Sequence, residues 1–214
     1  MPRHLALRLT LGSVFLAITM PAFAGVPSPA NSSTPPCLVT CPFGDIPVTV
    51  VVRDLANNPI VGSNVVLDFH NCPAAHLCSP GESSHALPYT LDPIARTLSL
   101  VTPAGGSVTF AAQVGGTGPA GSVSVFADGV LLHQYALASP DQDGDGTVNL
   151  FFGPDGPTFT SKVGTSNPTA DFDCSGLVDA ADQAIESHHS DHACFGFIDA
   201  AGKSTWGRLK QHYR

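Results

Sequence analysis

The sequence has few basic residues and few of the large aromatic residues that stack on sugars. Lysine and arginine together number 9 against 17 aspartates and glutamates, and the formal net charge is −8 at pH 7. An acidic chain of this kind gives no reason to expect a nucleic-acid partner. One tryptophan, Trp206, and three tyrosines argue against a groove of exposed aromatic side chains for polysaccharide.

The chain also lacks the short motifs of common hydrolases. It contains no G-x-S-x-G nucleophile elbow and no H-E-x-x-H zinc-protease helix. Its carboxylates concentrate in two acidic loops near the C-terminal end, where they suit cation binding better than proton transfer. We therefore expect a protein that is not an enzyme.

Only one apolar run is long enough to raise the question of a membrane. Residues 1–24 contain Arg3 and Arg8, then an apolar run from about Leu9 to Met20, and small residues before Ala24. This pattern predicts a secretory signal peptide cleaved after Ala24. A membrane anchor is the alternative, but the run is shorter than the roughly 20 residues that span a bilayer. We expect a secreted or cell-surface protein with no membrane span after cleavage.

Six cysteines in an exported chain predict disulfides. Neighbours along the chain give the working pairs Cys37/Cys41, Cys72/Cys78 and Cys174/Cys194. An alternative joins the first four cysteines across the N-terminal domain. A zinc site is a less favoured alternative, because an oxidising compartment favours disulfides; its ligands would be Cys72, Cys78, His70 and His76.

The middle of the chain has the pattern of a β-sandwich. Residues 25–44 are rich in proline and serine and predict a linker. Within residues 45–139, apolar residues alternate along short segments separated by glycine and proline turns. Val48, Val50 and Val52 form one such face, and a second is formed by Val65, Leu67 and Phe69. We expect an all-β fold of two packed sheets.

Two stretches of this region resemble the bacterial Ig-like domains of the invasin/intimin type: "VTVVVRDLANNPIVGSNVVLDF" and "LVTPAGGSVTFAAQVGGTGPAGSVSVFADG". The resemblance implies a Greek-key sandwich that acts as a spacer or presents a binding surface. Residues 70–93 depart from the family pattern as an insertion. We expect a surface loop there, either used for recognition or passive.

The second acidic loop, "DFDCSGLVDAAD" from Asp171 to Asp182, fits a calcium loop at each position. Such a loop supplies side-chain oxygens at positions 1, 3 and 5, a carbonyl at 7, a ligand at 9 and a carboxylate at 12. A glycine at position 6 permits the sharp turn. The predicted ligands are Asp171, Asp173, Ser175, the Leu177 carbonyl, Asp179 and Asp182.

The first acidic loop, "DQDGDGTVNLFF", has the same beginning but ends differently. Its predicted ligands are Asp141, Asp143, Asp145, the Thr147 carbonyl and Asn149. Phe152 stands at position 12, so Asp155 or a water has to close the shell. We expect weaker calcium binding here, because a carboxylate is lost. Prolines in the next residues delay the helix, which we expect from near Pro157 over residues 158–164.

The two loops, with a helix predicted after each, resemble the dockerin family, whose repeats follow D-x-[ND]-x-[DS]-G-x-[VI]-[ND]-x-x-D. The resemblance covers residues 140–195 and implies a small helical module with up to two Ca²⁺ ions. Dockerins bind cohesin domains in polysaccharide-degrading complexes, so it also implies a cohesin-like partner. The irregular first helix departs from the family pattern and weakens that expectation.

Two features near the C-terminus are less specific. His188 and His192 have the spacing of a transition-metal pair, but the favoured interpretation is polar residues at a helix end. In residues 196–214, Trp206, Leu209 and Tyr213 predict a short amphipathic helix, either a sorting or docking peptide or a loosely held tail.

Together these features predict an exported, non-catalytic, calcium-binding protein of mainly β fold, with an Ig-like sandwich followed by a dockerin-like module. Its expected role is extracellular attachment or assembly, through a cohesin-like or other cell-surface protein. One alternative is an accessory subunit of a polysaccharide-binding or polysaccharide-degrading complex. Another is a structural surface protein in which calcium only adds rigidity.

Overall fold

The computed structural model describes residues 25–82, 87–194 and 196–197. The expected signal peptide and the expected helix around Trp206 lie outside the described residues. Within the described part of the chain, no helix has the length and apolar character needed to cross a membrane.

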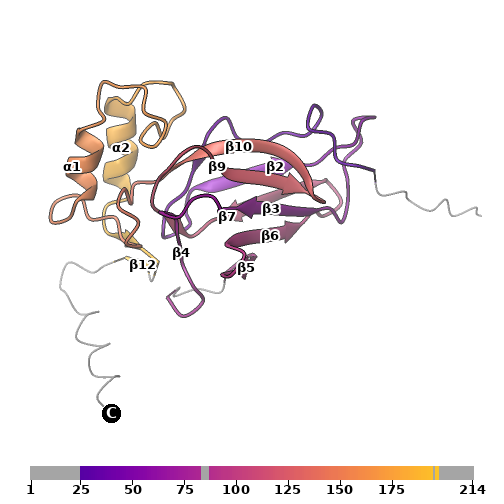
Figure 1. Cartoon of the computed structure of the whole chain (residues 1–214), viewed down its shortest axis with the longest axis horizontal. Helices are drawn as coiled ribbons and strands as arrows, with labels where there is room; N and C mark the ends of the chain where they lie inside the picture. The colour runs from indigo at the N-terminus through magenta and orange to yellow at the C-terminus, as the bar shows by residue number, and fades with distance from the viewer. Residues whose placement is uncertain (1–24, 83–86, 195, 198–214) are drawn as a thin grey trace, which may run out of the picture.

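Strands make up most of the regular secondary structure, as the sequence predicts (Figure 1). The largest sheet has six strands in the order β1-β10-β9-β3-β6-β5. All neighbours in it are antiparallel except β1 and β10, which are parallel. Its strands are β1 Leu38–Val39, β3 Asn64–Asp68, β5 Thr90–Asp92, β6 Thr97–Val101, β9 Gly118–Ala127 and β10 Val130–Ala138. Three two-stranded pairs complete the fold: β2 Pro47–Val51 with β7 Ser107–Ala111, β4 His76–Leu77 with β8 Val114–Gly115, and β11 His192–Ala193 with β12 Gly196–Phe197.

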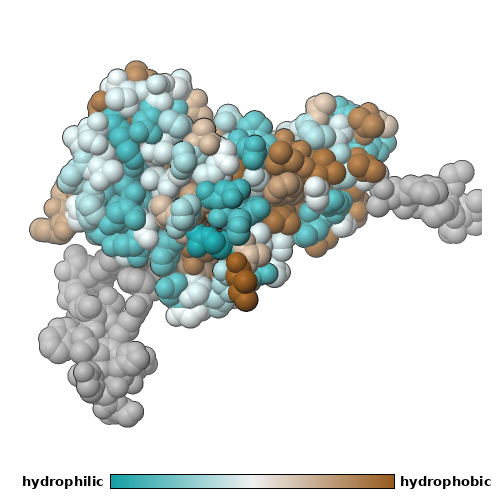
Figure 2. Space-filling model, viewed as in Figure 1, coloured by the Kyte–Doolittle hydropathy of each residue, from teal (hydrophilic) through white to brown (hydrophobic). Residues whose placement is uncertain are grey.

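The β2–β7 pair and the six-stranded sheet share one hydrophobic core. Val50 and Phe110 from the pair are fully buried, as are Val65, Leu67 and Val125 from the larger sheet. The predicted alternation on β2 and β3 is therefore confirmed. Burying each such side chain contributes about 1.5–3 kcal/mol relative to leaving it in water. Figure 2 shows hydrophobic residues gathered over the sheet on this face, whereas the end of the molecule that carries the helices is mostly hydrophilic.

The proline- and serine-rich segment 25–44 lies against the strands. It contributes β1 to the sheet, and Ser33 forms a bridge with Val51. The hydroxyl of Tyr135 donates to the carbonyl of Pro35 at 2.6 Å. Composition predicted a linker here, but these contacts and a disulfide at Cys37 hold the segment in place.

Two short helices, α1 Asp155–Thr160 and α2 Ala180–His188, lie side by side at one end of the molecule (Figure 1). α1 begins two residues before the predicted start at Pro157 and ends sooner, since a proline is tolerated in a first helical turn. A second core joins this end to the sheet. Its buried members are Val39, Ala138, Phe159, Ala170, Phe172 and Val178.

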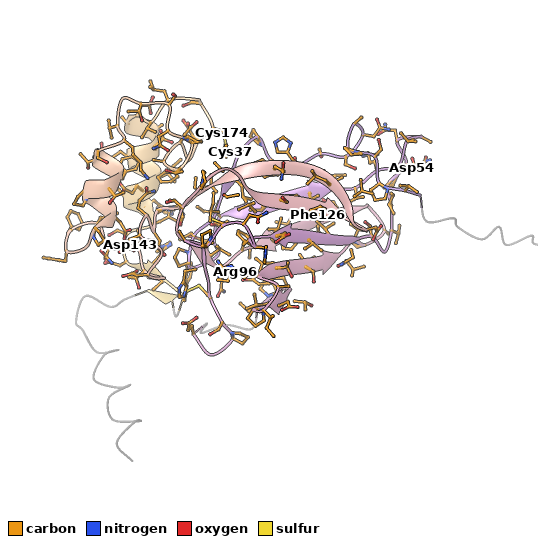
Figure 3. The ribbon with its side chains drawn as sticks, viewed as in Figure 1. Cys37, Asp54, Arg96, Phe126, Asp143 and Cys174 are labelled. Atoms are coloured by element: carbon orange, nitrogen blue, oxygen red, sulfur yellow. A yellow bond between two sulfur atoms is a disulfide. The ribbon has the colours of Figure 1, made fainter. Side chains whose placement is uncertain are left out.

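The disulfides join distant parts of the chain, and the neighbour pairing predicted from the sequence was wrong. Cys37 bonds Cys174, and Cys78 bonds Cys194, across 137 and 116 residues. The Cα atoms are 5.8 and 5.4 Å apart, which is the separation that a disulfide requires. Figure 3 shows Cys37 and Cys174 beside each other where the sheet meets the helical end. Two disulfides fit an extracellular protein.

The remaining described cysteines, Cys41 and Cys72, are free thiols buried in the protein. Because Cys78 is bonded, the alternative zinc site built on Cys72 and Cys78 loses a ligand and does not form. The inserted residues 70–93 are also more than a surface loop, since they supply β4, β5 and several buried side chains.

Candidate metal centre

The second acidic loop gathers three carboxylates around one point. Ligand oxygens of Asp171, Asp173 and Asp182 lie within 4.8 Å of one another. The Asp171 carboxylate accepts the backbone N–H of Ser175 at 3.0 Å and of Gly176 at 2.8 Å, which folds the loop inward. Gly176 has a φ of +88°, a left-handed conformation that favours glycine.

The first loop gathers three carboxylates in the same way. Oxygens of Asp141, Asp143 and Asp155 lie within 4.8 Å of one another. The Asp141 carboxylate accepts the backbone N–H of Gly146 at 2.9 Å, and Gly146 has a φ of +86°. Phe152, at the nominal closing position, points into solvent and is fully exposed.

Asp155 occupies the place in the first loop that Asp182 occupies in the second. Each carboxylate accepts backbone N–H groups from positions 2, 3 and 9 of its own loop, with closely matching distances. For Asp155 the donors are Gln142 at 2.6 Å, Asp143 at 3.2 Å and Asn149 at 2.8 Å. For Asp182 they are Phe172 at 2.6 Å, Asp173 at 3.1 Å and Asp179 at 2.8 Å. The first site was expected to be weaker because Phe152 replaces a closing carboxylate, and Asp155 supplies one.

Each loop also pairs with the chain that follows the helix of the other repeat. Position 8 of each loop is a fully buried valine, and its backbone makes two hydrogen bonds to that segment. Val148 bonds Asp191 and His192, and Val178 bonds Gly164 and Thr165, at 2.7–2.8 Å. Asp191 and Gly164 both have positive φ, +64° and +80°. The two repeats therefore exchange equivalent contacts, which supports the duplication inferred from the sequence.

The first cluster is electrostatically uncompensated. Burial, and then the neighbouring charge of Asp155, raise the pKa of Asp141 to about 8. Burial likewise raises the pKa of Asp155 to about 6. Within the described residues, no lysine or arginine forms an ion pair with either cluster. A bound cation would remove this repulsion.

The loop residues outside these clusters have local roles. The hydroxyl of Ser175 donates to the Leu177 carbonyl at 3.1 Å, and the carboxylate of Asp145 accepts the N–H of Thr147 at 2.9 Å. Asp179 caps α2 by accepting the N–H of Ala181 at 2.7 Å. These predicted ligands lie on the same loops as the carboxylate clusters but are not members of them.

Asn149, at position 9 of the first loop, offers one more oxygen. Its Oδ1 is buried and has no hydrogen-bond donor among the described residues. Such an atom costs about 1–3 kcal/mol unless something satisfies it, and a cation is one such partner.

The first loop is fastened directly to the strands. The N–H of Gly116 donates to the Asp141 carbonyl at 2.8 Å. A Cβ added at Gly115 would lie 1.8 Å from the Asp141 carboxylate, so only glycine leaves room for that side chain. The position of the Asp141 carboxylate is therefore set by the β8 backbone as well as by its own loop.

No protein-family model, curated protein or solved structure matches this chain.

Proposed function

We propose that this is an exported, non-catalytic protein in which a dockerin-like pair of loops binds two Ca²⁺ ions and supports attachment or assembly outside the cell. The sheet region serves as an Ig-like spacer. The observation that carries the proposal is the repeated hydrogen-bond pattern in which Asp155 and Asp182 close two acidic loops.

The donor chemistry fits calcium. Each loop presents carboxylates from three residues, and its other predicted ligands are also oxygens. Ca²⁺ takes six to eight such oxygens, whereas nitrogen and sulfur ligands suit zinc and copper. Because the first cluster holds uncompensated charge, binding free energy would stabilise the folded loops.

Phe151 and Phe152 favour an attachment role. They are 83% and 103% exposed and occupy the last two positions of the first loop, which places two apolar rings at the helical end of the molecule. A partner that covered them would bind through a surface ordered by the first calcium ion. The candidate partners are a cohesin-like or other surface protein, or a polysaccharide-associated complex.

A structural role is the second candidate. Both disulfides tie the helical end to the sheet region, which favours a rigid unit in which calcium adds further stability. Capture of surface proteins on the immobilised chain, with calcium and with chelator, separates the two candidates. Calcium-dependent retention that Phe151→Ala and Phe152→Ala together abolish supports attachment, and no retention supports the structural role.

Calcium binding itself is tested by titration calorimetry and thermal melting of the chelator-treated protein. We expect two ions per chain. At a free calcium concentration 100 times the dissociation constant, each site adds about 2.7 kcal/mol to the free energy of unfolding. A melting temperature that does not differ between calcium and chelator would contradict the proposal.

A further inference from the structure

A second type of cluster lies between the turn that follows β1 and the end of α2. Cys41 and Asp45 follow β1, and His189 and His192 follow α2. One potential ligand atom from each of these four residues lies within 4.8 Å of the others. Cys41 is fully buried, and His192 and His189 are 3% and 7% exposed. The calcium loops contribute none of these residues.

The distances within the cluster match the edges of a zinc tetrahedron. Zinc binds sulfur at about 2.3 Å and nitrogen or oxygen at about 2.0–2.1 Å, so tetrahedral angles give edges of about 3.6 Å for S–N and about 3.3 Å for N–O. The Sγ of Cys41 lies 3.6 Å from the Nδ1 of His192. The Oδ2 of Asp45 lies 3.2 Å from that same nitrogen and 3.5 Å from the Nε2 of His189.

His189 is oriented as a metal ligand would be. Its Nδ1 lies 2.7 Å from the carbonyl of Ile185, which can only accept, so Nδ1 carries a proton. The Nε2 of the ring then faces the Asp45 carboxylate at 3.5 Å, an arrangement that a cation between the two atoms would stabilise. A backbone carbonyl behind a histidine ligand is the usual way in which proteins fix the ring of a metal ligand.

The protein encloses the histidine side of the cluster, and the ring of His192 is almost fully buried. The ring of Phe43 packs 5.0 Å from that of His192 and restricts water at this side. Burial raises the pKa of the Cys41 thiol in the metal-free chain, but a coordinating thiol is deprotonated by the metal itself.

We propose that Cys41, Asp45, His189 and His192 form a tetrahedral zinc site. All four ligands come from the protein, so the site is closed and structural rather than catalytic. It joins the segment after β1 to the residues after α2, two segments that neither disulfide links to each other. The sequence pointed to His188 as the partner of His192, but His188 is exposed and outside the cluster.

Cobalt substitution tests this site separately from the calcium loops. The purified protein, with disulfides intact, is treated with chelator and titrated with Co²⁺. Thiolate coordination produces a sulfur-to-cobalt charge-transfer band, which oxygen-only loops cannot produce. We expect one equivalent of Co²⁺ per chain to produce the band, and equimolar Zn²⁺ to remove it.

Variants locate the site. We expect Cys41→Ser and His192→Gln to abolish the band and His189→Gln to shift or weaken it. Cys72→Ser is the matched control, because Cys72 is the other buried free thiol and should leave the band unchanged.

The spectrum of the unvaried protein decides the question even where a variant does not fold. If two free thiols per chain are counted and no charge-transfer band develops, the cluster is a hydrogen-bonded group without a metal and the proposal is wrong. A band that persists in Cys41→Ser, or that disappears in Cys72→Ser, would also overturn it. Metal analysis of the freshly purified protein should show one zinc per chain.

Discussion

At the residue scale, Asp155 and Asp182 hold the same place in two loops and permit a matched comparison. We expect Asp155→Asn and Asp182→Asn each to weaken calcium binding at their own loop by about 10–100-fold or more. Substituting a residue that only hydrogen-bonds to a metal ligand already has an effect of about that size. Titration calorimetry should show one strong site remaining in each variant. Phe152→Ala is the control, because its side chain is fully exposed, and it should keep both sites.

The sequence predicted the ligands of the second loop in full, whereas for the closure of the first it left Asp155 and water as alternatives. Asp182 falls at position 12, where the pattern requires an acid, whereas Asp155 lies three residues beyond that position. A fixed spacing cannot reveal it, because the residues between Asn149 and Asp155 form an extra turn that returns the carboxylate to the cluster. The available signal was an acid at the start of a helix, close after a broken loop.

Glu186 allows a prediction about pH. Its side chain is buried, its Oε1 has no hydrogen-bond donor among the described residues, and burial, followed by the charge of Asp155, raises its pKa to about 8. Such an acid destabilises the fold increasingly as pH rises between two values. The lower is its pKa in the unfolded chain, near 4.3, and the upper is its raised pKa in the folded protein. Glu186→Gln should therefore add about 1–3 kcal/mol to the free energy of unfolding near pH 8 and little at pH 4.

Urea unfolding of the chelator-treated protein at a series of pH values measures this difference. Glu82→Gln serves as the control, because the pKa of the half-exposed Glu82 is lowered by hydrogen bonds from Ser79. A gain for Glu186→Gln that is independent of pH would contradict the argument.

At the element scale, the short helices depend on packing rather than on their own helical preference. Helices as short as α1 and α2 are not stable alone in water, so their buried faces must hold them. Phe159 on α1 is 1% exposed, and its ring stacks on that of Phe172 with centroids 5.7 Å apart.

Phe159→Ala should therefore lower the free energy of unfolding by about 3–5 kcal/mol. Phe151→Ala, which removes the same ring from a position that is 83% exposed, should change it by no more than about 0.5 kcal/mol. Chemical unfolding in saturating calcium compares the two. Equal losses would mean that the second core does not stabilise the helices.

The strands were easier to predict than the helices. Alternation in β2 and β3 follows from one buried face, which sequence shows directly. The start of α1 depends on where Asp155 is held by the loop, and that is a tertiary contact. Segment 25–44 was misleading for the same reason, because its contacts with Val51 and Tyr135 come from far along the chain.

At the scale of the whole molecule, each disulfide adjoins one acidic loop. Cys174 stands at position 4 of the second loop with a φ of +62°, where the first loop has Gly144. Cys194 donates its N–H to the carbonyl of Gly146 in the first loop at 3.1 Å. Each bond therefore fixes the backbone of a different loop.

We expect replacement of Cys37 and Cys174 by serine to lower the free energy of unfolding by about 2–5 kcal/mol and to weaken calcium binding mainly at the second loop. Replacement of Cys78 and Cys194 should affect mainly the first loop. Calcium titration of both double variants, each with the other bond intact, provides the comparison. Equal weakening of both loops in either variant would contradict this assignment.

Sequence spacing could not reveal these pairs, because a disulfide depends on the distance between Cα atoms in space. Cys37 lies close to Cys41 in sequence, but its nearest sulfur in the fold belongs to Cys174, which the second core brings against β1. The zinc cluster was hidden for the same reason, since its two halves come from opposite ends of the described part of the chain.

The long separation of the bonded cysteines has a consequence for how the protein is made. Ribosomes synthesise Cys37, Cys41, Cys72 and Cys78 before either Cys174 or Cys194 exists. During that interval Cys37 and Cys78 can form disulfides only with cysteines that are not their partners in the folded protein. Correct maturation therefore requires either delayed oxidation or an isomerase that exchanges early bonds, and the yield of protein with both native disulfides should depend on the thiol–disulfide balance of the compartment.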